Sequence, residues 1–284
     1  MYKHGIEVTE RATSFPSPLS TKYGVQVIFG TAPINLAENP AAAVNRPIKA
    51  TTFEEAEKAL GYSEDWEKYT LCQSMYASFK LFQINPVIFV NVLDPQKHVA
   101  ELAAKAYEVR GHQAIITATG VIAETIKVSA QIQAARAGSA KTGEAMTAEE
   151  PLELANNVDY VKSYDDYGQL VITLLSTSAA YEAAEITAEG KKLDPEMVTE
   201  ADIIGAYDVE TGAETGMEVL RQVYPKHGIV PGILMAPGWT ENPNIGAALQ
   251  AKCEDINGAF RALCLVDLDT TKAKKHTDCK KAKT

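Results

Sequence analysis

The sequence predicts an α/β protein, α+β overall, with a discontinuous body that has a largely parallel sheet and is interrupted by an inserted, mostly antiparallel β domain. The body is indicated by short, nearly continuous apolar runs bounded by Gly, Pro or Asp, with amphipathic helical stretches between them. The insertion is indicated by shorter runs that alternate apolar and polar residues after about residue 98. With 284 residues, the chain can bury a sizeable core without disulfides.

The first part of the body is predicted to form a strand, a helical crossover and a second strand. The two strands are the apolar runs VQVIFGTAP (25–33) and PVIFVNVLD (86–94), which we expect to be buried on both faces. Between them, Thr52 and Glu55 form a T-x-x-E capping box that opens one helix, and a second amphipathic helix is predicted over 63–82. This order of elements is typical of a parallel sheet.

The inserted region is predicted to contain a β-hairpin over 160–175, with its turn at Asp165–Gly168, where glycine can adopt the positive φ that such loops need. The stretch 130–155 fits either a helix or a flexible loop and is left unassigned. After Leu193 the α/β pattern resumes. Its predicted elements are helices over 199–207, 215–226 and 244–256 and buried strands over 228–238 and 260–269.

Five segments are therefore expected along the chain. They are an extended N-terminal arm (1–22), the first part of the α/β body (23–97), the inserted β-rich domain (98–192), the second part of the body (193–271) and a basic, disordered tail (272–284). In the arm, Gly5 to Thr9 alternates apolar and polar residues, so it could add an edge strand to another sheet. A disordered N-terminus is the alternative interpretation.

Charge and composition argue against several classes of partner. The chain has 27 basic and 37 acidic side chains, and six of the lysines lie in the tail, so the body is more acidic than the whole and unsuited to nucleic acid. No signal peptide and no apolar run of about 20 residues is present, so we expect no membrane partner and synthesis in the cytoplasm. The four cysteines, Cys72, Cys253, Cys264 and Cys279, form no C-x-x-C pair and are expected to be reduced thiols, the first three with structural roles.

No complete catalytic or metal-binding set is found, so no catalytic, cofactor-binding or metal-ligating residue is predicted. A nucleophile elbow and a phosphate-binding loop are absent from the sequence. The histidines His4, His98, His112, His227 and His276 are scattered singly, and ordinary surface or loop roles are expected for them.

One motif deserves comparison with an enzyme family. LCLVDLDTT (263–271) places Asp267 and Asp269 just past a predicted buried strand, where open α/β sheets bind ligands. It resembles the first motif of haloacid-dehalogenase-type phosphatases, which implies Asp267 as nucleophile and Asp269 as general acid beside Mg²⁺. The later motifs of that family have no match, because only thirteen residues follow Thr271. The favoured interpretation is that these carboxylates accept backbone N–H bonds at a turn, as Asp94 and Asp194 are expected to do.

Several phrases, in order, carry a different resemblance. They are YKHGIEVTE (2–10), VIFGTAPINLAENP (27–40), ALGYSEDWEKYTLC (59–72), PVIFVNVLDPQKH (86–98), LDPEMVTEADIIGAYDVETGAETGMEVL (193–220), VYPKHGIVPGILMAPGW (223–239) and INGAFRALCLVDLDT (256–270). Together they resemble the contractile tail sheath proteins of bacteriophages and phage-tail-like bacteriocins, in the Gram-positive myophage-like branch. The likeness is weakest over 99–192.

This resemblance implies a structural subunit, not an enzyme. Sheath subunits form stacked rings around an inner tube, joined by extended arms that add strands to neighbouring sheets, and their contraction drives the tube through a cell envelope. The implied partners are neighbouring sheath subunits, bound through the N-terminal arm, the tube protein and the baseplate. The implied location is the virion, with assembly in the bacterial host cytoplasm.

Two further expectations concern what the chain lacks and what else it could be. Sheath proteins of this branch continue into a C-terminal domain with the receiving sheet, whereas this sequence ends in a lysine-rich stretch, so we expect that domain to be missing and the chain alone not to build a sheath. Apart from the magnesium-dependent phosphatase, a ligand-binding module is the remaining alternative, and a deep apolar pocket between two lobes would favour it.

Overall fold

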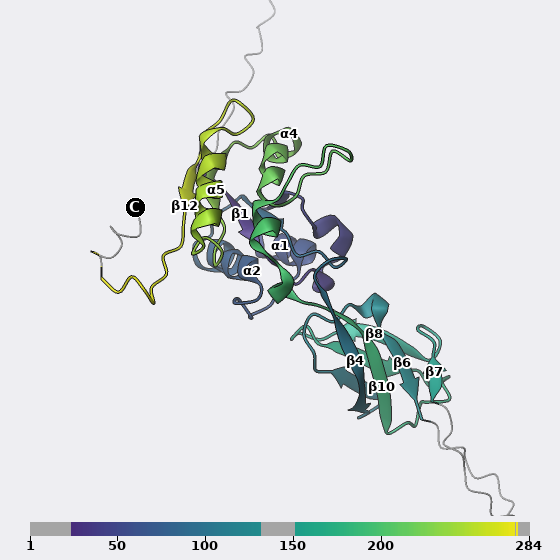
Figure 1. Ribbon diagram of the computed structural model, residues 1–284. Helices are drawn as coiled ribbons and strands as arrows, with labels where there is room; N and C mark the ends of the chain where they lie inside the picture. The colour runs from purple at the N-terminus through teal and green to yellow at the C-terminus, as the bar shows by residue number, and fades with distance from the viewer. Residues whose placement is uncertain (1–23, 132–150, 276, 278–284) are drawn as a thin grey trace, which may run out of the picture.

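The computed structural model describes residues 24–131, 151–275 and 277, which form two units joined end to end (Figure 1). We call the first the α/β body and the second, between Val99 and Leu193, the β unit. The predicted α+β class is confirmed: the body has a mixed, largely parallel sheet, and the β unit has two antiparallel sheets. The predicted arm (1–22) and most of the predicted tail (272–284) lie outside the described residues.

The body is built on a five-stranded sheet with β1 near its centre. In sheet order the strands are β12 (Leu263–Leu265), β11 (Pro231–Met235), β1 (Val25–Gly30), β3 (Val87–Asn91) and β2 (Ile48–Ala50). The pairs β12–β11, β11–β1 and β1–β3 are parallel, whereas β2 runs antiparallel to β3 at the edge. β3 is buried along its whole length, as its continuous apolar run predicts.

The helical segments of the body connect and cover these strands. They are α1 (Phe53–Leu60), α2 (Thr70–Met75), the π-helical turn η3 (Tyr76–Leu81), α3 (Glu200–Ile204), the 3-10 helix η6 (Gly216–Gln222), α4 (Val223–His227), α5 (Pro243–Glu254) and the 3-10 turns η1 (Ile34–Leu36), η2 (Pro40–Ala43) and η5 (Pro195–Met197). α2 packs on β1, and α5 packs on β11 and β12.

Two helix predictions need correction. The helix predicted over 63–82 begins only at Thr70, because the preceding residues are tied to the end of β1: the Thr31 hydroxyl donates to the Lys68 carbonyl at 2.7 Å, and the Leu71 amide donates to the Thr31 carbonyl at 3.0 Å. The helix predicted over 215–226 is a 3-10 helix as far as Gln222. The capping residue Thr52 is confirmed, since its side chain accepts the Glu55 amide. The Glu55 carboxylate, however, accepts from the amide and hydroxyl of Thr51, the residue before Thr52.

The β unit consists of two antiparallel sheets around a core of its own. One sheet has the order β4 (Val99–Glu108), β10 (Glu185–Leu193), β6 (Lys127–Ala130) and β7 (Leu152–Leu154), and the other has the order β5 (Gln113–Ile116), β9 (Leu170–Leu174) and β8 (Tyr160–Tyr164), with the 3-10 turn η4 (Ala123–Thr125) beside them. Ile116, Leu170 and Ile172 are fully buried in this core, which is separate from that of the body.

The predicted hairpin of the β unit is confirmed. β8 and β9 pair across it, and the Gly168 amide donates to the Asp165 carbonyl at 3.0 Å with Gly168 at φ +73°. The Asp165 side chain also accepts the amides of Tyr167 and Gln169, as expected of an aspartate that starts a turn. Most of the unassigned stretch 130–155 lies outside the described residues, between β6 and β7.

The last strand of the body differs from the prediction. The run 260–269 was expected to be a buried strand, but β12 has three residues, and Leu263 and Leu265 are 69% and 54% exposed. The reason is its position at the sheet edge: β11 pairs with one side, and α5 packs on the face to which Cys264 belongs. A sequence run cannot indicate which strand will be at an edge.

The body and the β unit are joined by β4 and β10, which lie side by side in Figure 1. His98 fixes this junction. Its backbone donates to the Asp94 carbonyl and accepts from the Asp194 amide, while its Nδ1 accepts the Asp94 amide at 2.9 Å. Nδ1 is therefore unprotonated in the neutral ring, and Nε2 carries the proton, 3.4 Å from Asp202 Oδ2.

Asp202 links the junction to the start of α3. Burial acts to raise its pKa, but hydrogen bonds from the Thr199 side chain and amide, together with His98, outweigh burial and hold the pKa below its usual value. A lowered folded-state pKa stabilises the protein above the unfolded-state pKa, and this stabilisation is lost as the pH falls through the folded-state pKa.

We therefore expect Asp202→Asn to lower the free energy of unfolding by about 1 kcal/mol at pH 7, the typical value of a helix N-terminal cap interaction. The deficit should shrink as the pH falls below about 4. Urea unfolding between pH 3.5 and 7 measures it. The matched control is Asp166→Asn, the same change at an exposed turn position, for which little deficit is expected. A deficit that grew on acidification would contradict this account.

Candidate functional site

The carboxyl ends of β1 and β11 form the point at which the chain changes direction across the sheet. After β1 the chain crosses to β2 and β3 on one side, and after β11 it crosses to β12 on the other. Such a switch point leaves a crevice in which open α/β sheets commonly bind ligands. A cavity of about 760 Å³ opens there. Its lining residues are Trp66, Glu67, Lys68, Thr70, Gln73, Pro195, Glu196, Val198, Pro237, Gly238 and Trp239.

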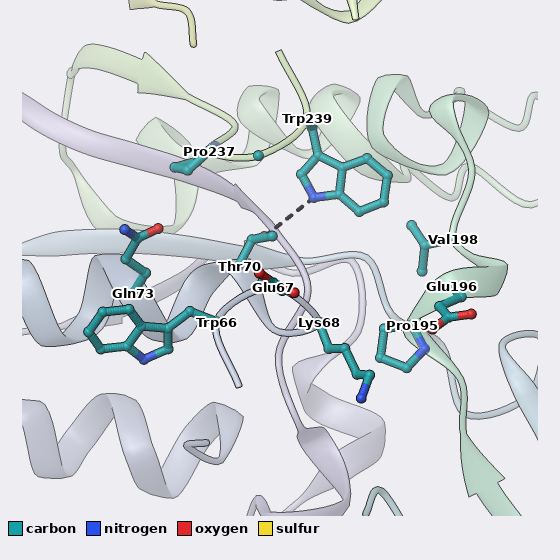
Figure 2. Close-up of a pocket in the computed structure, with 11 residues that line it drawn as sticks. Trp66, Glu67, Lys68, Thr70, Gln73, Pro195, Glu196, Val198, Pro237 and Trp239 are labelled. Carbon is teal, nitrogen blue, oxygen red and sulfur yellow. Dashed lines mark hydrogen bonds between the residues drawn. The ribbon is translucent and has the colours of Figure 1, made fainter. Parts of the chain in front are cut away.

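Two tryptophans define this cavity, which we call the Trp pocket. Figure 2 shows the rings of Trp66 and Trp239 on either side of Thr70, and the indole N–H of Trp239 donates to Thr70 Oγ1 at 3.3 Å. The ring of Trp66 lies 5.5 Å from that of Tyr76. The chain has two tryptophans, and both line this pocket.

The floor of the pocket is held by a close contact between β1 and α2. The Thr31 and Thr70 hydroxyls each accept the amide of the other residue, at 3.2 and 3.3 Å. This contact requires glycine at the last position of β1, because a Cβ on Gly30 would lie 2.3 Å from Thr70 Oγ1. The polar groups of the floor are therefore engaged with one another.

The charged groups of the pocket lie at its rim. Lys68 forms an ion pair with Asp65 at 3.0 Å, and that hydrogen bond raises the pKa of Lys68. Glu67 and Glu196 are exposed. The rim therefore carries two carboxylates in addition to a compensated lysine, which suits a basic or neutral ligand better than a phosphate.

Both aspartates singled out from the sequence make structural contacts, and Asp267 bonds Gly238, which lines the pocket. Asp267 Oδ2 accepts the Gly238 amide and the Thr240 hydroxyl, both at 2.8 Å, and the Asp267 amide donates back to the Thr240 hydroxyl at 2.7 Å. Asp267 thus ties the end of β12 to the loop that carries Trp239. Asp269 accepts from Thr271 and Lys272, and the hydrogen bond from the Lys272 ammonium followed by that from Thr271 lowers its pKa.

These contacts favour structural roles for both carboxylates over the phosphatase interpretation. Asp269 forms a turn as predicted, whereas Asp267 bonds Gly238 and Thr240, which lie 29 and 27 residues earlier in the chain. Asp94 and Asp194 behave as predicted, each accepting the amide two residues ahead, from Gln96 and Glu196. Among the described residues, no group of three His, Cys, Asp or Glu side chains is placed to hold a metal ion.

We expect Asp267→Ala to loosen β12. A hydrogen bond to a charged group contributes about 1.5–3 kcal/mol, so amide hydrogen exchange over Leu263–Leu265 should become at least about tenfold faster. Asp269→Ala removes a carboxylate two residues away whose contacts are confined to its own turn, and it should leave those amides almost unchanged. Equal acceleration by both variants would show that Asp267 has no special role in holding the strand.

The other residues noted in the sequence, the cysteines and histidines, are buried or contact neighbouring groups where the structure describes them. Burial raises the pKa of the Cys72 and Cys253 thiols to about 12, so neither is a thiolate nucleophile at neutral pH. His112 stacks on Tyr181 with ring centroids 3.9 Å apart, and His227 Nε2 lies 2.9 Å from the Pro47 carbonyl oxygen. His4, His276 and Cys279 lie outside the described residues.

Comparison with known proteins adds an independent observation. Over 251 residues, 88% of the chain, the sequence aligns with a phage protein at 27% identity. The chain is similar to the tail sheath protein of Burkholderia phage BcepMu. It spans 46%, about half, of that relative's length. No protein-family profile matches the sequence, and no solved structure matches it.

Of the 284 residues, 251 are aligned, so 33 lie outside the alignment, which is too few to leave out either the α/β body or the β unit. In the part of the chain that the structure describes, no helix has the length and apolar character needed to cross a membrane. The Trp pocket was missed by sequence reasoning, since Trp66 and Thr70 lie far along the chain from Trp239. The available signal was the rarity of tryptophan combined with the position of Trp239 just after a predicted strand.

Proposed function

We propose that this protein is a structural subunit of a contractile phage-type tail sheath, which polymerises around an inner tube and contracts to drive the tube through a cell envelope. The observation that carries the proposal is the similarity to the BcepMu tail sheath protein over 88% of the chain. The ordered resemblance of separate sequence phrases to the same family points in the same direction.

The two-unit architecture supports this proposal. A rigid α/β body with a buried parallel sheet can pack against copies of itself in a ring, while the β unit, which has its own core, projects away from it. In the assembled sheath the β unit would lie on the outside, where changes in sequence do not disturb the contacts between bodies. The resemblance of the sequence phrases to sheath proteins is weakest over 99–192, which is the β unit.

The proposed partners are neighbouring sheath subunits, reached through the N-terminal arm (1–22), together with the tube protein and the baseplate. An arm that adds a strand to a neighbouring sheet keeps subunits attached while their bodies rotate, because backbone hydrogen bonds carry the link. The proposed location is the virion tail, after assembly in the host cytoplasm. We propose a role in phages, prophages or phage-tail-like bacteriocins without further distinction.

Immunogold electron microscopy tests this proposal. An antibody raised against the purified chain should label the outer surface of contractile tails released by the organism that carries the gene, along the whole tail. Antibody adsorbed beforehand with the purified chain is the control and should leave the tails bare. Labelling confined to the tail tip, to the inner tube or to material without tails would overturn the proposal.

A further inference from the structure

We propose that the Trp pocket binds the proline-containing segment Phe15-Pro16-Ser17-Pro18-Leu19 of a neighbouring copy of this chain. The inference rests on the proposed self-assembly and deepens it, because it assigns a receiving site for part of the arm within residues that the structure describes. The pocket lies at the switch point of the parallel sheet, far along the chain from the segment that it would bind.

The chemistry of the pocket favours a proline-rich ligand. Its walls are the rings of Trp66 and Trp239 together with Pro195, Pro237 and Val198 (Figure 2). Its floor offers few free hydrogen-bonding groups, because the Thr70 hydroxyl is already bonded to Thr31 and Trp239. Grooves lined by aromatic rings bind polyproline II segments, since such segments are stiff before binding and lose little entropy when they bind.

The chain contains one segment with matching properties. Residues 15–19 are Phe-Pro-Ser-Pro-Leu, in which two prolines two residues apart favour an extended backbone and the flanking Phe and Leu supply apolar surface. Glu10 and Arg11 precede the segment with opposite charges, and residues 12–19 carry no charge. The segment can therefore enter between the apolar walls without burying a charge, and the exposed carboxylates of Glu67 and Glu196 stay at the rim.

Chain length favours a neighbouring copy as the donor. The arm enters the body at the amino end of β1, whereas the pocket is at the carboxyl end, and the six residues of β1 rise about 20 Å. From Pro18 to Val25 the chain spans at most about 25 Å when fully extended. Almost the whole length would be used along the strand, leaving too little for the detour around the helices that cover the sheet. A second copy has no such restriction.

Tryptophan fluorescence tests the proposal directly, because both tryptophans of the chain line the pocket. The receiver is the full chain with Phe15→Ala, Pro16→Ala and Pro18→Ala, whose own segment is disabled and whose pocket is intact. The probe is a synthetic peptide of residues 11–20, RATSFPSPLS. We expect a saturable change in emission, and at least about tenfold weaker binding of the same peptide with Phe15, Pro16 and Pro18 replaced by Ala.

Sedimentation of the full chain provides a second measurement that requires no peptide. The unmodified chain should self-associate at least about tenfold more tightly than the triple variant, and the peptide should dissociate the unmodified assemblies. Trp66→Phe in the unmodified chain should weaken association, and retention of its unfolding free energy shows that the body is intact.

The inference would be overturned if the peptide produced no change in emission, or if the alanine peptide produced the same change. It would also be overturned if the emission of the unmodified chain did not depend on protein concentration, because that is expected when the segment binds within its own copy. A response to ATP but not to the peptide would assign the pocket to a nucleotide and also overturn it. If the chain assembles but ignores the peptide, only this inference fails. If the peptide binds but the antibody labels no tails, the segment contact stands and the sheath proposal fails.

Discussion

Gly205→Ala is expected to unfold the α/β body or to destabilise it by more than about 3 kcal/mol. Gly205 ends α3 with φ +73° and ψ −178°, a region that only glycine enters readily. A Cβ there would lie 1.8 Å from the Thr215 carbonyl oxygen and 2.8 Å from Gly216 Cα. Backbone atoms cannot rotate away as a side chain would, so the contact between α3 and η6 would have to open.

The matched control is Gly212→Ala. Gly212 has φ +70°, but no atom lies within 4 Å of a Cβ built on it, so only the cost of the left-handed backbone remains, about 1–2 kcal/mol. Urea unfolding followed by tryptophan fluorescence measures both variants, since both tryptophans belong to the body. Similar losses for the two variants would show that backbone conformation, and not the contact with Thr215, determines the cost.

Phe89→Ala should destabilise the body by about 3–5 kcal/mol, the usual cost of removing a buried phenylalanine ring. Phe89 lies in the middle of β3, is fully buried and has the ring of Phe79 6.1 Å away. β3 pairs with β1 on one side and β2 on the other, so the surrounding backbone has little freedom to collapse into the cavity.

Phe82→Ala removes the same ring from a site that is 69% exposed, and it should change the free energy of unfolding by no more than about 0.5 kcal/mol. The separate cores add a second expectation: amide exchange of β9 in the β unit should be unchanged by Phe89→Ala wherever the body remains folded. Loss of protection in β9 together with the body would show that the two cores unfold as one.

Local sequence signals predicted many elements because the interactions that form them are local. Continuous apolar runs predicted β1 and β3, Thr52 predicted the start of α1, and Asp165 with Gly168 predicted the turn between β8 and β9. Predictions failed where contacts with distant segments of the chain determine the bounds or the exposure of an element. α2 begins late because β1 binds the residues before it, and β12 is exposed because no further strand pairs with it among the described residues.

The sequence predicted where in the sheet the candidate site lies, but not which residues line it. Asp267 was correctly expected at the carboxyl edge of the sheet, but its bonds to the distant residues Gly238 and Thr240 could not be predicted from the sequence around it. The pocket beside it could not be predicted, because Trp66 and Trp239 are brought together by the pairing of β1 with β11, which are about 200 residues apart along the chain.

The paired strands that join the two units also have a mechanical consequence. β4 and β10 are hydrogen-bonded along nearly their whole length, so the connection behaves as a stiff ribbon and not as a hinge. Ten residues of β4 extend about 33 Å, and a small turn of the body therefore becomes a much larger displacement at the tip of the β unit. A fluorophore at Glu185, an exposed residue that pairs with Glu108 at the end of β4 away from the body, would therefore report rotations of the body that are too small to detect at the body itself.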